Sequence, residues 1–203
     1  MRWIASYLVK LHNSEYKAQK PPTVAHWTPT LLRYQPTKGH AISETVTKKL
    51  TVSPLSIIPP TTGEYGTKVQ NSATSYMQEL RRWGSYIRGH MLNSKIHGPG
   101  EDKNLVPISS TFNKEMEGGI EKTIKDEVIA RNKVVFYEIE PINWGQYKGS
   151  GHNPHRPNAE EQLPKDFKMT LKPMKLKHPG DDGTDFKNWE INPKKSALSH
   201  YSP

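Results

Sequence analysis

One ordered succession of short elements constrains the fold of this chain more than any other feature. From Ser85 onward the residue pattern predicts a strand, a turn-rich loop, a second strand, a helix and a third strand. The first two strands read SYIRGHMLN and NLVPIS, and the loop between them contains the Gly-Pro-Gly turn at residues 98–100. Two strands followed directly by a helix form a compact β-β-α unit, in which side chains from all three elements can meet.

The helix of this unit is the strongest helical pattern in the chain. Apolar residues recur at every fourth position and form one stripe: Met116, Ile120, Ile124 and Val128. Ser110 or Thr111 can cap its N-terminus. Gly118 and Gly119 interrupt it, which predicts either a kink or a close approach of the backbone to another element.

Three further segments predict the rest of a sheet. Residues 44–60 are rich in β-branched side chains and indicate a strand that ends at Pro59 and Pro60. The segments KVVFYEIEP (133–141) and DFKMTLKPMKLK (166–177) also have the pattern of strands. No internal repeat is visible. We therefore expect a single α+β fold built around a small antiparallel sheet.

Composition limits how much of the chain can form a core. Hydrophobic residues make up 33% of the sequence and there are 17 prolines, whereas an average globular chain is roughly 45–50% hydrophobic. We therefore expect the folded domain to span residues 41–177, with the β-β-α unit at about 84–141. Residues 1–40 are predicted to be an extended or partly disordered arm, and residues 178–203 a C-terminal tail.

The charge balance favours a polyanionic partner such as nucleic acid. Net charge is +9 and the isoelectric point is near 9.5. Residues 80–140 carry 10 basic and 9 acidic side chains, so the basic surplus lies in the flanks. This suits an acidic site within a basic frame, and simple solubility explains it equally well. Four lysines between residues 166 and 177 either follow a phosphate backbone or belong to a half-exposed strand: Lys168, Lys172, Lys175 and Lys177.

The sequence lacks two features that would place it in other classes. It contains no cysteine, so neither disulfides nor thiolate metal sites can form. Its first residues, MRWIASYLVKLHNSEYK, contain an apolar run that is too short for a transmembrane helix and no clear small-residue cleavage site. We therefore expect no membrane segment and no signal peptide.

The β-β-α unit carries the residue types that phosphodiester hydrolysis requires. Such a reaction can use a neutral histidine as general base together with one hard divalent cation. His90 ends the first strand, and Arg88 projects from the same strand face, where it could contact a phosphate. Asn113 lies in the first turn of the helix and Glu121 eight residues later, so an amide oxygen and a carboxylate can approach one cation.

Each of these residues also has an ordinary structural interpretation. His90 could be a strand histidine bonded to a backbone carbonyl, and Asn113 could be a first-turn residue with no other role. Glu117 is expected to belong to a solvated helix face, and His97 to be a loop residue. The ordered set as a whole favours the catalytic interpretation.

Four elements of the β-β-α unit resemble a known family. They are Arg-Gly-His at 88–90, Asn-Leu-Val-Pro at 104–107, Asn113 and Glu121. The set resembles the DNA/RNA non-specific endonucleases of the ββα-metal (His-Me finger) superfamily, over about residues 84–141. The resemblance implies an α+β fold with a ββα-metal unit and extended N- and C-terminal arms. It also implies a nuclease that hydrolyses DNA, with RNA as a second substrate, and uses Mg²⁺ or another divalent cation.

The resemblance further implies a role for each matching residue. His90 would be the general base, and Arg88 would stabilise the transition-state phosphate. Asn113 would bind the metal, and Glu121 would complete the metal site as a carboxylate that orders metal-bound water. Asn104 would brace the loop that positions this site.

Two more features of the resemblance concern the context of such a nuclease. The acidic residue that commonly precedes Arg-Gly-His is Ile87 here, which removes an orienting group from the site. The stretch GHMLNSKIHGPGEDKNLVPIS is similar to C-terminal domains of bacterial polymorphic toxins. That similarity implies an effector that is secreted or injected by a bacterial secretion system and acts in the target-cell cytoplasm. A cognate immunity protein would neutralise it.

Two alternatives from other functional classes stay open on the sequence alone. One is a non-catalytic nucleic-acid-binding module with the same fold, for which Ile87 is the main hint. The other is an interaction protein of a secretion particle, which would bind nucleic acid weakly at low salt and another protein tightly.

Overall fold

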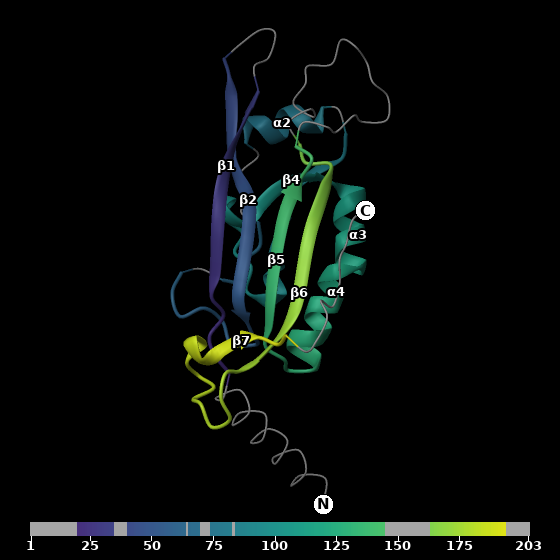
Figure 1. The fold of residues 1–203 in the computed structure, drawn as a ribbon. Helices are drawn as coiled ribbons and strands as arrows, with labels where there is room; N and C mark the ends of the chain where they lie inside the picture. The colour runs from purple at the N-terminus through teal and green to yellow at the C-terminus, as the bar shows by residue number, and fades with distance from the viewer. Residues whose placement is uncertain are drawn as a thin grey trace, which may run out of the picture.

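A computed structural model shows two antiparallel sheets with helices packed behind them (Figure 1). It describes residues 20–34, 40–63, 65–69, 74–82, 84–144 and 163–193. The larger sheet has the strand order β1-β2-β5-β6-β7, and the smaller one pairs β3 with β4. This arrangement confirms the predicted α+β class with its small antiparallel sheet.

The larger sheet is built from five strands, all paired antiparallel with their neighbours. Their bounds are β1 (Ala25–Tyr34), β2 (Ile42–Leu55), β5 (Val135–Ile142), β6 (Asp166–Leu176) and β7 (Trp189–Ile191). Strand β2 begins two residues earlier than predicted and ends at Leu55, before the two prolines that were expected to end it. Strands β5 and β6 lie where their patterns predicted them.

The β-β-α unit has the predicted order of elements. It consists of β3 (Tyr86–His90), β4 (Leu105–Ser109), α3 (Ser110–Gly118), α4 (Ile120–Lys125) and the π-helical turn η3 (Asp126–Ala130). The loop between its strands contains the short 3-10 turns η1 (Ser94–Ile96) and η2 (Asp102–Asn104). A short helix, α2 (Ser75–Arg81), precedes the unit, and the 3-10 turn η5 (Phe186–Asn188) precedes β7.

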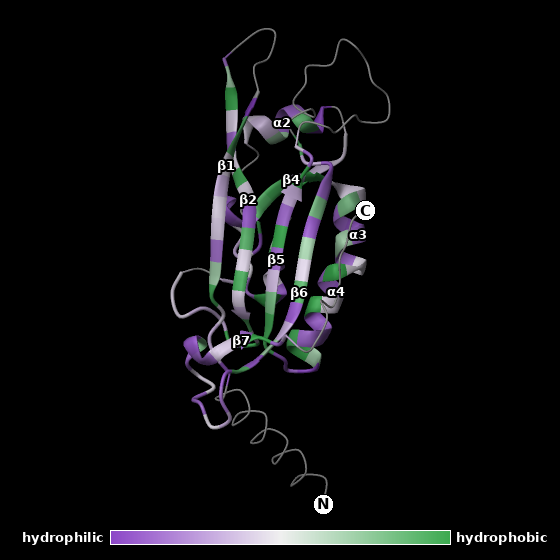
Figure 2. Cartoon of the chain, in the orientation of Figure 1, coloured by the Kyte–Doolittle hydropathy of each residue, from purple (hydrophilic) through white to green (hydrophobic). Residues whose placement is uncertain are grey.

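The core lies between one face of the larger sheet and the β-β-α unit. Alternate residues of β5 are buried, and the same holds for the middle of β6. Figure 2 shows that hydrophobic and hydrophilic residues follow one another along both strands. The Phe112 ring of α3 stacks on Phe167 of β6 with the ring centroids 4.9 Å apart. The predicted helical stripe is buried at all of its positions: Met116, Ile120, Ile124 and Val128.

The helix begins one residue earlier than predicted and breaks at its glycines. The Ser109 hydroxyl, and not that of Ser110 or Thr111, accepts the Phe112 amide at 3.1 Å. Gly119 has φ −97° and ψ −100°, which separates α3 from α4. A side chain added at Gly118 would meet nothing within 4 Å. The structure therefore favours the kink over a close approach at Gly118.

Parts of both predicted arms belong to the sheet. Residues 25–34 form β1, which pairs with β2 along its whole length, so the sheet begins before residue 41. Residues 189–191 form β7 and pair with β6 inside the expected C-terminal tail. Within the predicted arms, residues 1–19, 35–39 and 194–203 lie outside the described residues. Of the helices in the described segments, none has the length and apolarity needed to cross a membrane.

Candidate active site

The β3–β4 hairpin brings the two predicted motifs side by side. In the antiparallel register Arg88 lies opposite Pro107, Gly89 opposite Val106 and His90 opposite Leu105. The Arg-Gly-His segment is therefore paired directly with the Leu-Val-Pro segment. His90 is the last residue of β3, at the point where the chain leaves the hairpin for the loop.

The His90 ring is half-buried, and its hydrogen bond determines which nitrogen can act as a base. Its Nε2 atom lies 3.3 Å from the Thr67 carbonyl oxygen. A carbonyl only accepts, so this hydrogen bond requires the proton on Nε2 and leaves the lone pair on Nδ1. Burial lowers the pKa of His90 below its usual value, although the Thr67 carbonyl opposes the shift. His90 is therefore neutral near pH 7, as a general base must be.

Asn104 makes several hydrogen bonds to the loop that follows His90. Its buried side chain accepts the Leu92 amide at 2.9 Å and donates to the carbonyls of Leu92 and Pro99, each at 2.9 Å. The Met91 amide donates to the Asn104 carbonyl at 2.8 Å. Asn104, at the end of the loop, thereby holds the start of the loop at Leu92 and its middle at Pro99.

Close backbone contacts fix the same loop. A Cβ atom added at Gly98 would lie 1.5 Å from the Leu92 carbonyl oxygen, so only glycine fits there. From the larger sheet, the buried Tyr137 hydroxyl donates to the Met91 carbonyl at 3.0 Å. The Gly-Pro-Gly segment, which was predicted to be a turn, directly follows the turn at His97 and has a bend at Gly100, and its first glycine is required for close packing.

Asn113 lies against the strand residue next to His90. A Cβ atom built on Gly89 would be 3.4 Å from the Asn113 amide oxygen and 2.2 Å from Ile108 Cδ1. The small residue at Gly89 thus lets the first turn of α3 approach β3 closely. The amide oxygen predicted to bind a metal is brought to the centre of the Arg-Gly-His segment.

Glu121 is buried at the start of α4, and its partners were not foreseen. Its carboxylate accepts a hydrogen bond from Asn93 Nδ2, and Lys125 Nζ lies 3.8 Å away. Burial raises the pKa of Glu121, and the Asn93 and Lys125 contacts partly offset this. In the sequence Asn93 is recognisable only as a polar residue three positions after His90. Glu117, by contrast, is exposed, as expected.

Arg88 is buried and engaged by two carboxylates. Its Nε atom lies 2.9 Å from Glu44 Oε1, and its Nη2 atom pairs with Asp102 Oδ1. From the sequence we expect this side chain to contact a phosphate, and nothing in the sequence points to Glu44, which comes from β2 in the larger sheet. Only an alignment of β2 with β3 in space could have suggested the pair, because 44 residues separate the two positions.

His97 occupies the loop position expected for it. It follows η1 with φ 77°, and its Nε2 atom lies 3.1 Å from the Ser56 carbonyl oxygen. Burial lowers the pKa of His97, as it does for His90. The two histidines therefore have similar surroundings but occupy different places: His90 ends β3, and His97 closes a turn.

Comparison with known families shows the family to which the chain belongs. Residues 54–172, more than half of the chain, match the family model described as DNA/RNA non-specific endonuclease. The chain belongs to the DNA/RNA non-specific endonuclease family. A comparison with curated proteins finds no match. Membership of this nuclease family implies a phosphodiester hydrolase whose substrate is nucleic acid.

The region matched by the endonuclease family includes every predicted site residue of the β-β-α unit. It begins at the end of β2 and extends to Lys172 in β6. Glu44, the buried partner of Arg88, lies outside it. The ion pair therefore joins the endonuclease unit to a part of β2 that lies outside the family match.

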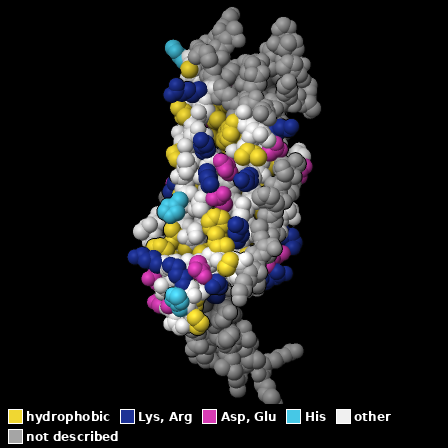
Figure 3. All heavy atoms as spheres, in the orientation of Figure 1, with side chains coloured by type: hydrophobic (Ala, Val, Ile, Leu, Met, Phe, Trp, Pro, Cys, Tyr) yellow, Lys and Arg dark blue, Asp and Glu magenta, His cyan; other side chains and the backbone are white. Residues whose placement is uncertain are grey.

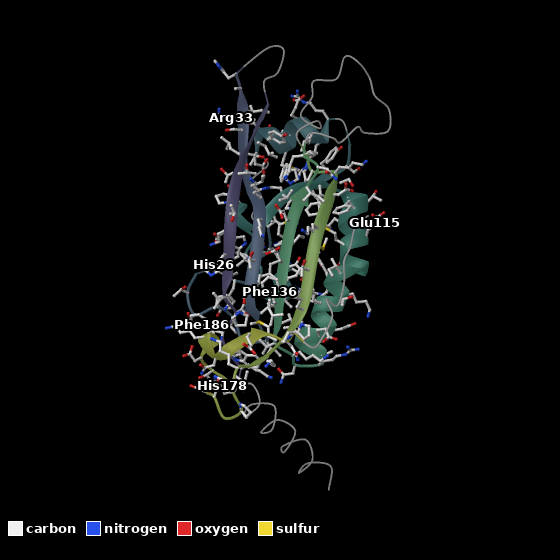
Figure 4. All side chains as sticks on the ribbon, in the orientation of Figure 1. His26, Arg33, Glu115, Phe136, His178 and Phe186 are labelled. Carbon is white, nitrogen blue, oxygen red and sulfur yellow. The ribbon has the colours of Figure 1, made fainter. Side chains whose placement is uncertain are left out.

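The lysines of β6 do not all share the face of the site. Lys168 and Lys172 alternate with the buried Met169 and Leu171, so they project from the opposite, open face of the sheet. On that face basic and acidic side chains are interspersed with apolar ones (Figure 3), and Phe136 lies among them (Figure 4). Lys175 pairs with Glu190 at 2.8 Å. Contact of these lysines with nucleic acid stays a prediction.

The available oxygen donors suit a hard divalent cation of the kind that nucleases of this family generally use. Within the described segments no three histidine, aspartate or glutamate side chains gather into a site of their own. The unit offers instead the Asn113 amide oxygen and the Glu121 carboxylate, whose pKa is raised by burial. Mg²⁺ keeps most of its waters and needs few protein oxygens, so this sparse set fits it.

Proposed function

We propose that this chain is a metal-dependent endonuclease that hydrolyses DNA and RNA without sequence preference. The observation that supports it best is the contact of Asn113 with Gly89, because it places a metal-binding oxygen against the residue that precedes His90 in β3, within the matched unit. Sequence preference is not expected, since recognition through phosphates carries no base information.

The protein's own residues account for activation of the nucleophile. His90 Nδ1 takes a proton from the attacking water, and the Thr67 carbonyl holds the ring in the required tautomer. The lowered pKa of His90 keeps this nitrogen unprotonated near neutral pH. Asn113, with Glu121 nearby in sequence, would hold Mg²⁺, which supplies positive charge to the leaving oxygen. Asn93 and Lys125 orient the Glu121 carboxylate.

A cleavage assay with controlled metal content tests this function. Purified protein is incubated with supercoiled plasmid or with single-stranded RNA, either with Mg²⁺ or with excess EDTA. We expect rapid, sequence-independent cleavage of both substrates with Mg²⁺, and loss of cleavage with EDTA that returns when Mg²⁺ is restored. Binding of DNA without cleavage under any divalent cation would support the non-catalytic alternative. If the protein neither binds nor cleaves nucleic acid, the result would favour an interaction protein.

The biological role that the toxin resemblance suggests is an effector. In this proposal the protein is secreted or injected by a bacterial secretion system, degrades nucleic acid in the target-cell cytoplasm and is neutralised by an immunity protein. Expression in a bacterial cytoplasm tests it: growth should stop and chromosomal DNA should fragment, whereas a His90→Asn variant should be tolerated. Normal growth with active, soluble nuclease would contradict the effector role.

A further inference from the structure

The Arg88 guanidinium is shared by two carboxylates that differ greatly in exposure. The side chain of Arg88 is 4% exposed and that of Glu44 is 1% exposed, whereas the side chain of Asp102 is 58% exposed. Glu44 approaches Nε from inside the protein, and Asp102 engages Nη2 from the solvent side. One guanidinium therefore has a buried carboxylate partner and a surface one.

Glu44 is firmly held as the buried partner. The Thr74 hydroxyl, at the N-cap of α2, donates to Glu44 Oε2 at 2.7 Å. Burial raises the pKa of Glu44, and the negative charge of Asp102 adds to this shift, while Thr74 and Arg88 oppose it. The two carboxylates are thus close enough to repel each other. Removing Asp102 from the guanidinium would relieve that repulsion and leave Arg88 anchored by Glu44.

Asp102 can leave Arg88 without disturbing its own backbone. Its carbonyl accepts the Leu105 amide at the end of η2, and the next carbonyl, of Lys103, accepts the Thr47 hydroxyl. These bonds hold the turn to β4 and β2 independently of the Asp102 carboxylate. A rotation of one exposed side chain is therefore enough to open the solvent side of the Arg88 guanidinium.

Arg88 is well placed to receive a phosphate. It lies two residues before His90, and side chains two apart in a strand share a face and start roughly 7 Å from each other. A guanidinium binds carboxylate and phosphate oxygens with the same planar donor geometry. A phosphodiester carries one negative charge, as does Asp102, so exchange of one for the other leaves the charge around Arg88 unchanged.

We propose that Asp102 occupies the phosphate position on Arg88, and that a substrate phosphate next to the scissile bond displaces it. Arg88 then holds the substrate through Nη2 while Glu44 fixes the guanidinium from behind. Asp102 acts as a built-in competitor that weakens substrate binding and rejects ligands lacking a phosphate. This inference rests on the proposed nuclease function, and it names how that site contacts its substrate.

Oligonucleotide affinity of an Asp102→Asn variant tests the proposal. Binding of a short fluorescein-labelled DNA strand is followed by fluorescence anisotropy in EDTA, so that cleavage does not interfere. Glu101→Gln is the matched control: it removes the same charge from the adjacent position, where the carboxylate pairs with Lys103 at 2.8 Å. We expect the Asp102 variant to bind about fivefold more tightly than the control variant. Equal or weaker binding by Asp102→Asn would overturn the proposal.

Two further measurements separate loss of the fold and absence of nuclease activity from failure of the competitor role. Asp102→Ser, examined by circular dichroism beside Asp102→Asn, should fold normally; if both variants lose the native fold, Asp102 is a brace and not a displaceable competitor. Plasmid cleavage by the unaltered protein is measured separately. If the unaltered protein cleaves plasmid but the Asp102 and Glu101 variants bind the oligonucleotide with equal affinity, only the proposed role of Asp102 as a competitor is rejected. If the protein neither cleaves plasmid nor binds the oligonucleotide, both the nuclease function and the competitor role of Asp102 are rejected.

Discussion

Replacing His90 with asparagine will lower the rate of plasmid cleavage by about 10²–10⁴-fold, the usual contribution of a positioned general base. Asparagine is shorter than histidine, so the Thr67 carbonyl loses its hydrogen bond from Nε2, and the matched His97→Asn variant loses the equivalent bond. Asparagine has no nitrogen that can accept a proton near neutral pH. The rate constant under saturating substrate should therefore fall much more than the apparent affinity does, as measured by initial rates over a range of DNA concentrations.

His97→Asn is the matched control for this prediction. His97 is also half-buried, and its Nε2 atom also faces a backbone carbonyl, that of Ser56. Asparagine tolerates the positive φ at this position. The control should cleave at nearly the rate of the unaltered protein. If the two variants lose activity equally, His90 has no special chemical role and the loss reflects damage to the loop.

Replacing Asn104 with alanine will destabilise the protein by about 3 kcal/mol or more. The change leaves the buried Leu92 amide and the carbonyls of Leu92 and Pro99 without their side-chain partner, and each such group costs energy when it is buried unsatisfied. For a chain of this size the melting temperature should fall by roughly 6–12 °C. Thermal unfolding followed by circular dichroism measures this directly.

Asn188→Ala provides the comparison for the stability measurement. Asn188 donates one hydrogen bond to a backbone carbonyl, that of Asp182, at 3.0 Å, but this bond is exposed to solvent. Its loss should change stability by about 0.5 kcal/mol or less. A small effect at Asn104 would mean that the loop after His90 is held by other contacts, such as the one from Tyr137. Retained stability with lost activity would instead give Asn104 a direct role in the site.

The geometry of the β-β-α unit could be predicted because it depends on residues close in sequence. The segments containing His90 and Leu105 are joined by one loop, and adjacent strands of opposite direction pair readily. Asn113 then follows β4 by a few residues, so the order of elements alone brings it near β3. Its contact with Gly89 also has a sequence signal, the small residue inside Arg-Gly-His.

The features that sequence could not supply depend on distant parts of the chain. β1 comes from a proline-rich stretch that resembles an arm, and only pairing with β2 makes it part of the sheet. The buried carboxylate partner of Arg88, Glu44, is likewise on β2. The adjacent position 87 is isoleucine and lacks the acidic residue that the family commonly has there. Pairing across such distances depends on the assembled sheet and leaves no local pattern.

Local detail was limited by the ambiguity of neighbouring residues with similar chemistry. Ser109, Ser110 and Thr111 can each cap a helix, and the strand before the helix decides which hydroxyl reaches the free amides. The lysines of β6 alternate in sequence, but only the packing of Phe112 on Phe167 shows which face of that strand meets α3. The sequence therefore shows that Lys168 and Lys172 share one face of β6, but the structure is needed to show that this face points away from α3.

In the proposed site Asn113 binds the divalent cation and His90 is the general base. Crystals of the unaltered protein soaked in Mn²⁺, with anomalous diffraction recorded near the manganese edge, test the metal binding directly. We predict an anomalous peak at bonding distance from the Asn113 amide oxygen, and its disappearance in an Asn113→Ala crystal treated in the same way. A manganese ion bound elsewhere, with the Asn113 amide free of metal in a protein that cleaves DNA, would contradict the account.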